Sequence, residues 1–333
     1  MGRRDRFPAK GRLNVRVLVT GGAGFIGSHL CERLLERGDD VAVIDNFDPF
    51  YPERLKRRAL APLLERGMRL FTADIRDADA VDRALRESRP ERIVHLAALA
   101  GVRPSLERPA EYMDVNVRGT AVLLEAAREA GVERFVFGSS SSVYGANAVP
   151  PFQESARIDS PLSPYAASKA AGEQLVSTWR NLYGLEAISL RFFTVYGARQ
   201  RPDLAIHKFS RRILAGQKLP FFGDGTSRRD YTYIDDILAG VVAALSAPLS
   251  RHEIVNLGGA QTTSLRELIA LLEEALGARA ELDLQPEQKG DMPLTSADVS
   301  HAGAVLGYAP RTPLRQGLRK FADWIRGEGR DWV

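Results

Sequence analysis

The chain has 333 residues, of which 44% are hydrophobic and 26% are charged, and its formal net charge is +4. These totals are those of an ordinary soluble globular protein that is long enough for two lobes. The longest apolar run, Leu238 to Leu245, is far too short to span a bilayer, so we expect no membrane partner. The single cysteine, Cys31, excludes an internal disulfide and fits a reducing cytoplasm, where we expect the protein to lie.

The first twelve residues form a basic arm with five Lys and Arg side chains. This arm lacks the apolar core of a signal peptide, so we interpret residues 1–12 as a disordered basic leader. A nucleic-acid-binding arm is the alternative. No basic or aromatic stripe continues it elsewhere in the sequence, so we expect no nucleic-acid partner.

A strand, a glycine-rich turn and a helix follow the leader. Residues 15–20 form an apolar, β-branched run that is typical of a buried parallel strand. Gly22, Gly24 and Gly27 come next, and an amphipathic helix then runs to Gly38. In a dinucleotide-binding turn with this spacing, one glycine makes the tight turn, the next admits the pyrophosphate, and the third lets the helix pack close to the strand. An ordinary flexible turn is the alternative, but the flanking strand and helix favour a dinucleotide site.

A second strand, residues 41–44, ends at Asp45. This acid lies about 20 residues beyond the glycines, where a carboxylate accepts hydrogen bonds from the adenosine ribose and repels a 2′-phosphate. Residues 46–48 add no basic group to hold such a phosphate. The expected cofactor is therefore NAD, in preference to NADP.

Strand and helix signals alternate through the first two thirds of the chain, which predicts an α/β fold with a Rossmann-type doubly wound parallel sheet. Further strands are expected at residues 68–71, 92–96, 134–137, 186–192 and 253–256. Beyond 192 the alternation weakens and indicates a smaller α/β C-terminal substrate lobe. We expect an NAD-binding domain over 13–193 plus about 230–262, and the substrate lobe over about 194–229 plus 263–333.

Short polar or small residues follow the third and fourth strands. Asp74 and Ile75 are expected to meet the adenine ring at the carboxyl edge of the sheet, although Asp74 also fits a surface turn. Ala97 and Ala98 would let the cofactor lie against the backbone. His95, inside an apolar strand, is expected to be a buried core histidine rather than a catalytic one.

Three other local patterns predict secondary structure. A long helix is expected from about 111 to 130, with Gly119 in close backbone packing. Residues 221–225 resemble a hairpin turn. Ser264 and Glu267 have the spacing of a capping box that opens another helix.

Hydroxyl groups gather after the fifth strand. Residues 139–142 are four serines at a strand's carboxyl end, and Tyr165 and Lys169, four apart, share one face of a later helix. A tyrosine is a poor base near neutrality because its reference pKa is about 10. A nearby ammonium and the nicotinium charge would lower that pKa, and Lys169 can also hold the nicotinamide ribose. A simple surface pair is the alternative, but the upstream dinucleotide motif favours a catalytic pair.

Together these motifs resemble the extended short-chain dehydrogenase/reductase superfamily, in its nucleotide-sugar epimerase/dehydratase branch, from about Val15 to Leu318. The matching motifs are residues 20–27, 74–75, 95–98, Asn116, 139–145, 163–165 with Lys169, and 229–231. The resemblance implies tightly held NAD, a nucleoside-diphosphate sugar in the C-terminal lobe, no metal, and a homodimer with a four-helix interface. The cofactor contacts that it implies are Gly21, Gly24, Phe25, Ile26, Gly27, Asp45, Asn46, Asp74, Ile75, Ala97, Ala98, Asn116, Tyr165 and Lys169.

The resemblance also implies catalytic and substrate residues. Ser140 would work beside Tyr165, Arg229 would contact the diphosphate, and Asp291 would lie near the uridine ribose. The resemblance and the arguments below indicate a substrate site of Arg103, Ser140, Ser141, Ser142, Tyr165, Thr194, Arg201, Arg229 and Asp291.

Ser141 and Ser142 bear on the reaction type. Related sugar 4,6-dehydratases carry Asp-Glu at these two positions, and related decarboxylases usually carry Glu at the second. Hydroxyls are too weakly acidic or basic for the elimination of water. The lack of acids therefore favours a 4-epimerase, which needs only one proton carrier and NAD.

Segments 100–103, 139–145 and 193–203 look most like UDP-glucuronate 4-epimerases. UDP-galactose 4-epimerases typically have Asn at the position of Thr194, and often Arg at that of Gln288. An arginine fork suits a sugar carboxylate, and Arg201 is the first candidate, ahead of Arg103 and Arg199. A surface or dimer ion pair is the alternative for each.

The expected reaction is the reversible interconversion of UDP-glucuronate and UDP-galacturonate through a 4-keto sugar. The main alternative is a UDP-glucose/UDP-galactose 4-epimerase. A dehydratase, a decarboxylase and a catalytically silent NAD-binding regulator are less favoured.

Overall fold

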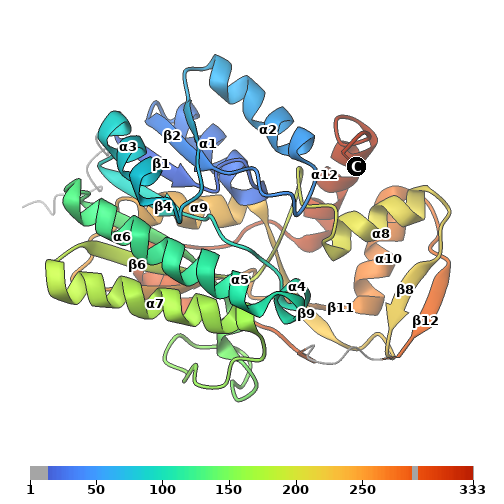
Figure 1. The fold of residues 1–333 in the computed structure, drawn as a ribbon. Coiled ribbons are helices and arrows are strands. Elements are labelled where there is room, and N and C mark those ends of the chain that lie inside the picture. The colour runs from blue at the N-terminus through green and yellow to red at the C-terminus, as the bar shows by residue number, and fades with distance from the viewer. Residues whose placement is uncertain (1–13, 287–291, 333) are drawn as a thin grey trace, which may run out of the picture.

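The computed structural model describes residues 14–286 and 292–332, so the basic leader and Asp291 lie outside the described residues. Seven strands of the described chain form one parallel sheet in the order β10-β6-β5-β4-β1-β2-β3 (Figure 1). These strands are β1 (Arg16–Thr20), β2 (Asp40–Asp45), β3 (Arg69–Thr72), β4 (Arg92–His95), β5 (Arg134–Ser140), β6 (Glu186–Phe192) and β10 (Glu253–Leu257). The order reverses at β1, which pairs with β2 on one side and β4 on the other. The predicted doubly wound sheet is confirmed, and its switch point is where such sheets bind ligands.

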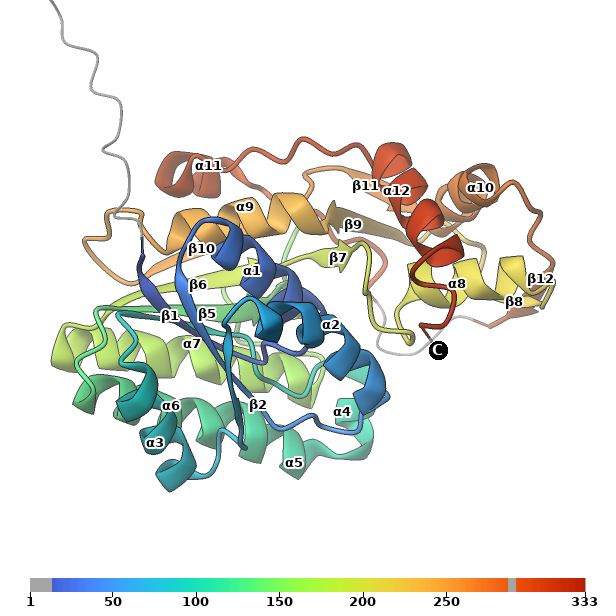
Figure 2. The same ribbon diagram turned by 90° about the horizontal axis from the view of Figure 1, so that it is seen from above.

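Helices cover both faces of the sheet (Figure 2). One face carries α3 (Ala78–Ser88), α6 (Gly119–Glu129) and α7 (Pro164–Tyr183), and the other carries α1 (Phe25–Glu36), α2 (Glu53–Glu65) and α9 (Ile234–Ala244). Successive side chains of a strand point to opposite faces, so Val17 and Val19 pack in one core cluster and Leu18 in the other. Both faces of the sheet are buried, which explains why the sequences of the central strands are nearly continuous apolar runs.

The amino edge of the sheet is tied together by arginines. The first residue of β1, β3, β4 and β5 is in each case an arginine: Arg16, Arg69, Arg92 and Arg134. Their guanidinium groups contact Glu91, Asp40, the Leu245 carbonyl and Glu186, respectively. These contacts all lie at the end of the sheet opposite to the catalytic candidates.

The smaller lobe follows β6. Its strands are β7 (Thr194–Tyr196), β8 (Leu219–Phe222), β9 (Arg228–Tyr233), β11 (Thr262–Ser264) and β12 (Leu282–Gln285), and its helices include α8 (Ala205–Leu214), α10 (Leu265–Leu276) and α12 (Leu314–Arg326). Figure 2 shows α8, α10, α12, β8 and β12 gathered beyond the carboxyl edge of the large sheet. The capping box of Ser264 and Glu267 is confirmed at the start of α10. The domain boundaries given above stay a prediction.

Two predicted elements differ from the structure. The segment 221–225 is no hairpin turn, because β8 pairs in parallel with the distant β12, while β9 pairs with β7 and β11. The long helix predicted over 111–130 is present as one helical run, but it contains a π-helical turn, η1 (Asp114–Arg118), between α5 (Pro109–Met113) and α6. A π-helical turn holds an extra residue, and here it brings the buried Asn116 into contact with Leu99 and Ser168.

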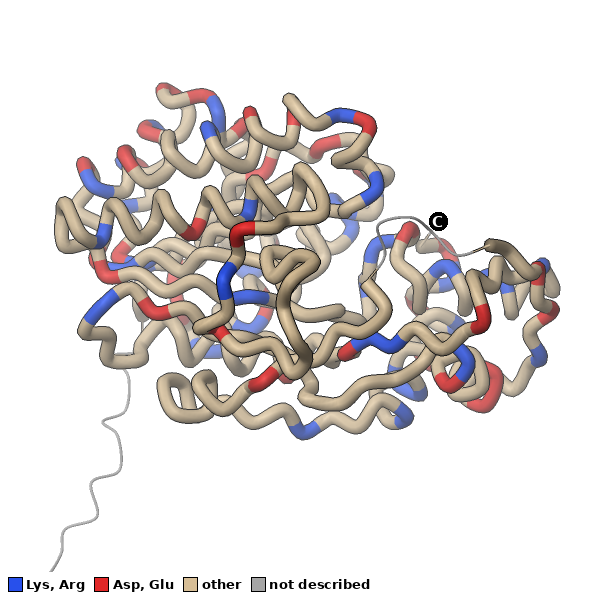
Figure 3. Tube along the Cα trace, turned by 90° about the horizontal axis from the view of Figure 1, so that it is seen from below, with Lys and Arg blue, Asp and Glu red and all other residues tan. Residues whose placement is uncertain are grey.

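The charge distribution and the lengths of the apolar helices complete the description. Basic and acidic positions are interspersed along the described chain when it is seen from below (Figure 3). Among the described residues, no helix is both long enough and apolar enough to cross a membrane.

Candidate active site

The turn between β1 and α1 is closed by glycines that leave no room for a side chain. Gly21 has a φ of 72°, and a Cβ there would lie 2.6 Å from the backbone nitrogen of Ala97. A Cβ on Gly27 would overlap the carbonyl oxygen of Gly21. The tight turn is therefore at Gly21 rather than Gly22, which instead packs against Val43. This close approach brings the N-terminus of α1 to the end of β1, as a pyrophosphate cradle requires.

Asp45 lies buried at the end of β2, beside this turn. Its carboxylate accepts hydrogen bonds from the backbone nitrogens of Ala23, at 2.9 Å, and Phe47, at 2.8 Å. Burial raises the pKa of Asp45, and the two backbone hydrogen bonds oppose the shift. Each carboxylate oxygen has a second acceptor site, so the group can also bind ribose hydroxyls.

The residues after β3 and β4 surround the same edge. Asp74 pairs with Arg76 and accepts a hydrogen bond from Asn46, and these contacts lower its pKa to about 2. Ile75 is buried against Gly119, which confirms the close packing expected at that glycine. Ala97 and Ala98 are partly buried.

His95 is a core histidine, as predicted. Its Nδ1 lies 2.6 Å from the Thr20 hydroxyl and its Nε2 lies 2.9 Å from that of Thr120. The Thr120 hydroxyl donates to the Asn116 carbonyl, so it accepts from Nε2, and Nδ1 accepts from Thr20. Burial lowers the pKa of His95 to about 3, so the ring is neutral.

The structure brings Ser140, Tyr165 and Lys169 together. Ser140 ends β5, while Tyr165 lies in the first turn of α7, after the N-cap residue Ser163. A hydrogen bond joins the Tyr165 phenol and the Ser140 hydroxyl. Lys169, one turn further along α7, is buried and donates to the Gly138 carbonyl at 2.7 Å. The serine cluster is divided between elements, with Ser141 and Ser142 in the short 3-10 helix η2 (Ser141–Tyr144).

The acidity of these groups is governed by burial. Burial raises the pKa of Tyr165, while the Ser140 hydrogen bond and the charge of Arg201 act in the opposite direction. The lowered tyrosine pKa expected from Lys169 is therefore not a property of this chain on its own. Burial lowers the pKa of Lys169 to about 8, and the nearby Glu173 opposes that shift.

Two buried groups behind the catalytic residues were not predicted. Glu173, four residues after Lys169, accepts a hydrogen bond from Ser139 at 2.6 Å and forms a two-point ion pair with Arg191. The Glu173 and Arg191 side chains are 0% and 2% exposed. The ion pair joins α7 to β6, and the Ser139 hydrogen bond joins the end of β5 to the same carboxylate. The spacing from Lys169 to Glu173, one helical turn, was the available signal in the sequence.

Arg201 is the predicted substrate arginine whose charge acts on Tyr165. Its guanidinium lies 4.8 Å from the Phe50 ring centre, and a Cβ on Gly101 would lie 4.0 Å from its Nη2. The guanidinium also binds Asp203 through Nε at 3.0 Å and Nη2 at 2.8 Å. Phe50, Gly101 and Asp203 were not among the predicted site residues.

The other candidate substrate residues are spread more widely. Arg199 binds Glu32 and His29 of α1, which favours the ion-pair interpretation for this arginine. Arg103 is exposed, with its guanidinium 5.9 Å from the ring centre of Phe222. The remaining described candidates are partly buried: Thr194 begins β7, and Arg229 lies on β9.

The switch-point turn and the Ser–Tyr–Lys arrangement define the class of the protein as an extended short-chain dehydrogenase/reductase. A family model described as the NAD dependent epimerase/dehydratase family matches residues 17–258. The chain belongs to this family, and its cofactor is NAD. The glycine cradle and Asp45 are residues that suit this cofactor.

Three similar proteins illustrate the relationship. A UDP-glucuronate 4-epimerase of Thermodesulfobacterium geofontis is 40% identical over 93% of this chain and 95% of its own. The crystal structure of UDP-glucuronic acid 4-epimerase from Bacillus cereus, with UDP-glucuronic acid and NAD, is 38% identical with a TM-score of 0.86, over 93% of this chain and 98% of that one. UDP-glucose 4-epimerase from Thermotoga maritima, with UDP-glucose, is 34% identical with a TM-score of 0.86, over 94% and 99% of the two chains.

Proposed function

We propose that the protein catalyses the reversible C4 epimerisation of UDP-glucuronate and UDP-galacturonate. The observation that carries this proposal is the position of Arg201, a cation that is packed over Phe50 near Gly101 and whose charge acts on Tyr165. A guanidinium at that position suits a substrate with a carboxylate close to its reacting carbon. The similar proteins from T. geofontis and B. cereus support the same substrate.

The chain's own residues account for the proton transfer. Tyr165 takes the proton of the C4 hydroxyl, and the Ser140 hydroxyl stabilises the phenolate by hydrogen bonding. Lys169, with a pKa of about 8, is largely protonated at neutral pH and places a positive charge one turn further along α7. NAD, held by the glycine cradle and Asp45, supplies the acceptor for the hydride that leaves C4 and later returns. The keto sugar must rotate in the site between the two hydride transfers, so that it is reduced on its opposite face.

The neighbouring residues restrict the reaction to epimerisation. Ser141 and Ser142 occupy η2 beside Ser140 and provide hydroxyls where a dehydratase needs an acid and a base. They can hydrogen-bond a carboxylate without acting as acid catalysts.

Arg201 also has a protective role in this proposal. Oxidation of glucuronate at C4 gives a β-keto acid, which loses carbon dioxide most readily when the bond to the carboxylate stands perpendicular to the carbonyl plane. A charge-assisted fork from Arg201 would hold the carboxylate away from that geometry.

A substrate panel tests the proposed function. Purified protein is incubated separately with UDP-glucuronate, UDP-galacturonate, UDP-glucose and UDP-galactose, and the C4 epimers are resolved by chromatography. We expect the two uronates to interconvert fastest. Faster turnover of UDP-glucose would replace this proposal with the rival below, and bound NAD without any turnover would indicate a regulator.

A UDP-glucose 4-epimerase is the second candidate. The ion pair with Asp203 balances the charge of Arg201, so a neutral C6 hydroxymethyl group would not meet an unpaired cation. The similarity to the T. maritima enzyme points the same way. Thr194, where UDP-galactose 4-epimerases typically carry Asn, argues against it.

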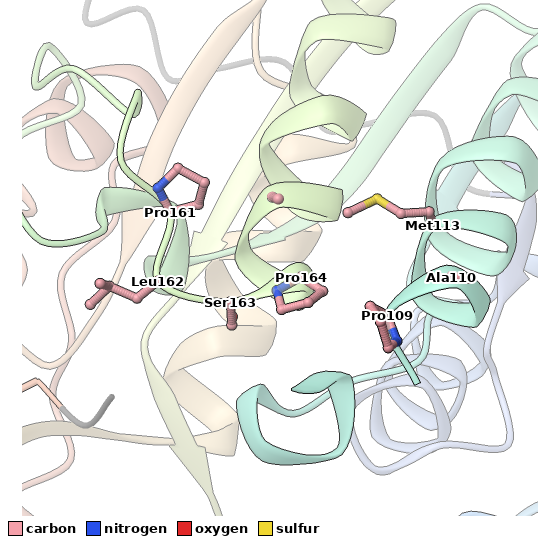
Figure 4. Close-up of a pocket in the computed structure, with 8 residues that line it drawn as sticks. Pro109, Ala110, Met113, Pro161, Leu162, Ser163 and Pro164 are labelled. Carbon is pink, nitrogen blue, oxygen red and sulfur yellow. The ribbon is translucent and has the colours of Figure 1, made fainter. Parts of the chain in front are cut away.

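A homodimer is part of the proposal. Pro109, Ala110 and Met113 from α5 face the segment before α7 across a shallow, mainly apolar depression (Figure 4). Its lining does not include Ser140, Tyr165 or Lys169, so it is separate from the catalytic groups. Met113 and Leu162 are 37% and 41% exposed, as expected for a face that a second copy covers.

Light scattering tests the homodimer. Leu162→Lys should convert the dimer to a monomer, because a charge at a buried interface is left unpaired. Leu284→Lys is the matched control, since Leu284 is 73% exposed on β12 in the smaller lobe. A monomeric wild-type protein would contradict this assignment.

The domain division and the location of the protein are further parts of the proposal. We assign NAD binding to 13–193 plus about 230–262 and the UDP-sugar to the rest, because β10 and α9 complete the large sheet and its helical layer. We assign the protein to the cytoplasm, where the buried free thiol of Cys31 would stay reduced.

A further inference from the structure

The Arg201 fork already holds a carboxylate. Asp203 accepts from Nε at 3.0 Å and from Nη2 at 2.8 Å, which are the two donors of one edge of the guanidinium. A carboxylate in this two-point geometry satisfies the edge completely. A substrate carboxylate that approaches Arg201 therefore meets a neutral pair rather than a free cation.

The two partners of this ion pair differ in how firmly they are held. The Arg201 side chain is 16% exposed and is packed over the Phe50 ring, whereas the Asp203 side chain is 43% exposed. Asp203 can therefore turn into water at low cost, while Arg201 cannot leave without losing its packing. The acid is the movable partner.

The position of Asp203 would also stabilise its carboxylate after release from Arg201. Asp203 stands two residues before the first residue of α8, and the N-cap residue, Leu204, makes no side-chain cap hydrogen bond. A carboxylate released near a helix N-terminus is stabilised by the unpaired N–H groups and the helix dipole. After release from Arg201, the Asp203 carboxylate therefore stays close to the positive end of the α8 dipole.

We propose that Asp203 is an internal counter-ion that occupies the Arg201 fork until the C6 carboxylate of the substrate displaces it. This inference rests on the proposed function. One carboxylate replaces another, so the site never exposes a buried unpaired arginine, and the net gain from binding a uronate is reduced. A neutral sugar, by contrast, leaves the Arg201–Asp203 pair intact. Asp203 thus sets the selectivity between charged and neutral C6 groups.

Asp203→Asn is the test. The amide keeps the shape of the side chain but competes less well for the guanidinium, so KM for UDP-glucuronate should fall about three- to fivefold, the range of a partly exposed ion pair. KM for UDP-glucose and the dissociation constant of UDP should change less than about twofold, since neither contains the displacing carboxylate. Asp203→Ser should reproduce the result if the amide perturbs the loop, and unchanged UDP binding reports that each variant is folded.

Asp40→Asn is the matched control. Asp40 forms a similar ion pair with Arg69, at 2.9 Å, and is 46% exposed, but it begins β2 at the amino edge of the sheet. This variant should leave both KM values unchanged.

Two outcomes would overturn the inference. A rise in KM for UDP-glucuronate in the Asp203 variants would show that Asp203 instead orients Arg201 for the substrate. Unchanged KM values, or equal changes in KM for the two sugars, would show that Asp203 neither competes with the substrate carboxylate nor orients Arg201. If the wild-type protein does not turn over UDP-glucuronate, the proposed function itself fails, which the wild-type assay detects before any variant is compared.

Discussion

At the scale of single residues, burial sets the protonation of the catalytic groups. It raises the pKa of Tyr165 and lowers that of Lys169 to about 8, so neither group has its charged form favoured by its surroundings. The phenolate that the reaction requires is opposed by desolvation and is supported by Ser140 and by the charge of Arg201. Arg201 therefore bears on two steps of the proposed reaction, the proton transfer and the retention of the carboxylate.

Tyr165→Phe should reduce turnover by about 10²- to 10⁴-fold, because it removes the proton carrier and little else. NAD should stay bound, since the glycine cradle and Asp45 are untouched. Turnover is measured with UDP-glucuronate, and bound NAD is measured by its absorbance after the protein is denatured. A variant that keeps most of its activity would show that the base lies elsewhere.

Arg201→Ala should raise KM for UDP-glucuronate far more than KM for UDP-glucose. The loss of a charge-assisted pair costs about 1.5–3 kcal/mol, which corresponds to about 10- to 150-fold. A UDP-pentose product should also appear as the freed carboxylate reaches the decarboxylating geometry, and mass spectrometry detects it. Arg199→Ala is the comparison, because Arg199 binds Glu32 and should affect both sugars alike. Equal effects of Arg201→Ala on the two sugars, with no pentose, would make Arg201 a structural partner of Asp203 only.

At the scale of elements, the turn between β1 and α1 depends on backbone contact between the helix and the strand end. A Cβ on Gly27 would overlap the Gly21 carbonyl oxygen, and a Cβ on Gly21 would meet the backbone of Ala97, so neither glycine admits a methyl group. The first turn of α1 is held in position by this contact, and the proposed pyrophosphate site lies there. The cradle thus depends on packing as much as on hydrogen bonding.

Gly27→Ala should therefore weaken NAD binding and lower the free energy of unfolding by about 1–3 kcal/mol, the usual cost of overpacking. Gly303→Ala is the control, because Gly303 lies within α11 (Ser300–Leu306) and a Cβ there meets only the Tyr308 carbonyl oxygen at 3.5 Å. Urea unfolding and NAD titration measure both effects. An unchanged NAD affinity in Gly27→Ala would refute the cradle.

The elements that the sequence predicted correctly are those whose signals are local. The β1–α1 turn, the capping box at Ser264 and the parallel strands depend on residues close together in the chain. The hairpin prediction at 221–225 was wrong because β8 pairs with β12, which lies far along the chain. The π-helical turn within the 111–130 helix accompanies contacts of Asn116 with two other segments, which no local pattern contains.

The same limit applies to the site. The placement of Tyr165 and Lys169 on one face of α7 could be predicted from their spacing, since a helix fixes which residues share a face. The Asp203–Arg201 pair could not be predicted, because it depends on the backbone shape of a loop. The buried Glu173–Arg191 pair joins a helix to a strand. The spacing from Lys169 indicates Glu173, but no local pattern indicates that Arg191 is its partner.

At the scale of the whole molecule, several buried or partly buried histidines make stability depend on pH. Burial lowers the pKa of His29 and His252 to about 4 and that of His95 to about 3. The unfolded chain binds protons at these groups near the reference pKa of about 6.5, so it takes up protons that the folded chain does not. Stability from these groups is present above about pH 6.5 and is lost as the pH falls towards 4.

Urea unfolding at pH 7.5, 6.0 and 5.0 should therefore show a decreasing free energy of unfolding. Buried Asp45 and Asp230, whose pKa values are raised, act in the opposite direction, so the decisive comparison is between variants. His95→Gln removes one of the three histidines and should lose less stability across the same interval. A steeper loss in that variant would show that another group causes the pH dependence.

The row of arginines at the amino edge has a consequence for how such a chain can change. Arg16, Arg69, Arg92 and Arg134 join neighbouring segments at the end of the sheet farthest from Ser140 and Asp45. These contacts between the strands therefore lie at the opposite end of the sheet from the candidate site. Substitutions at the carboxyl edge that alter which sugar is accepted would leave the arginine contacts at the amino edge intact. A designer can therefore alter the proposed C6 site near Arg201 without removing any of these amino-edge contacts.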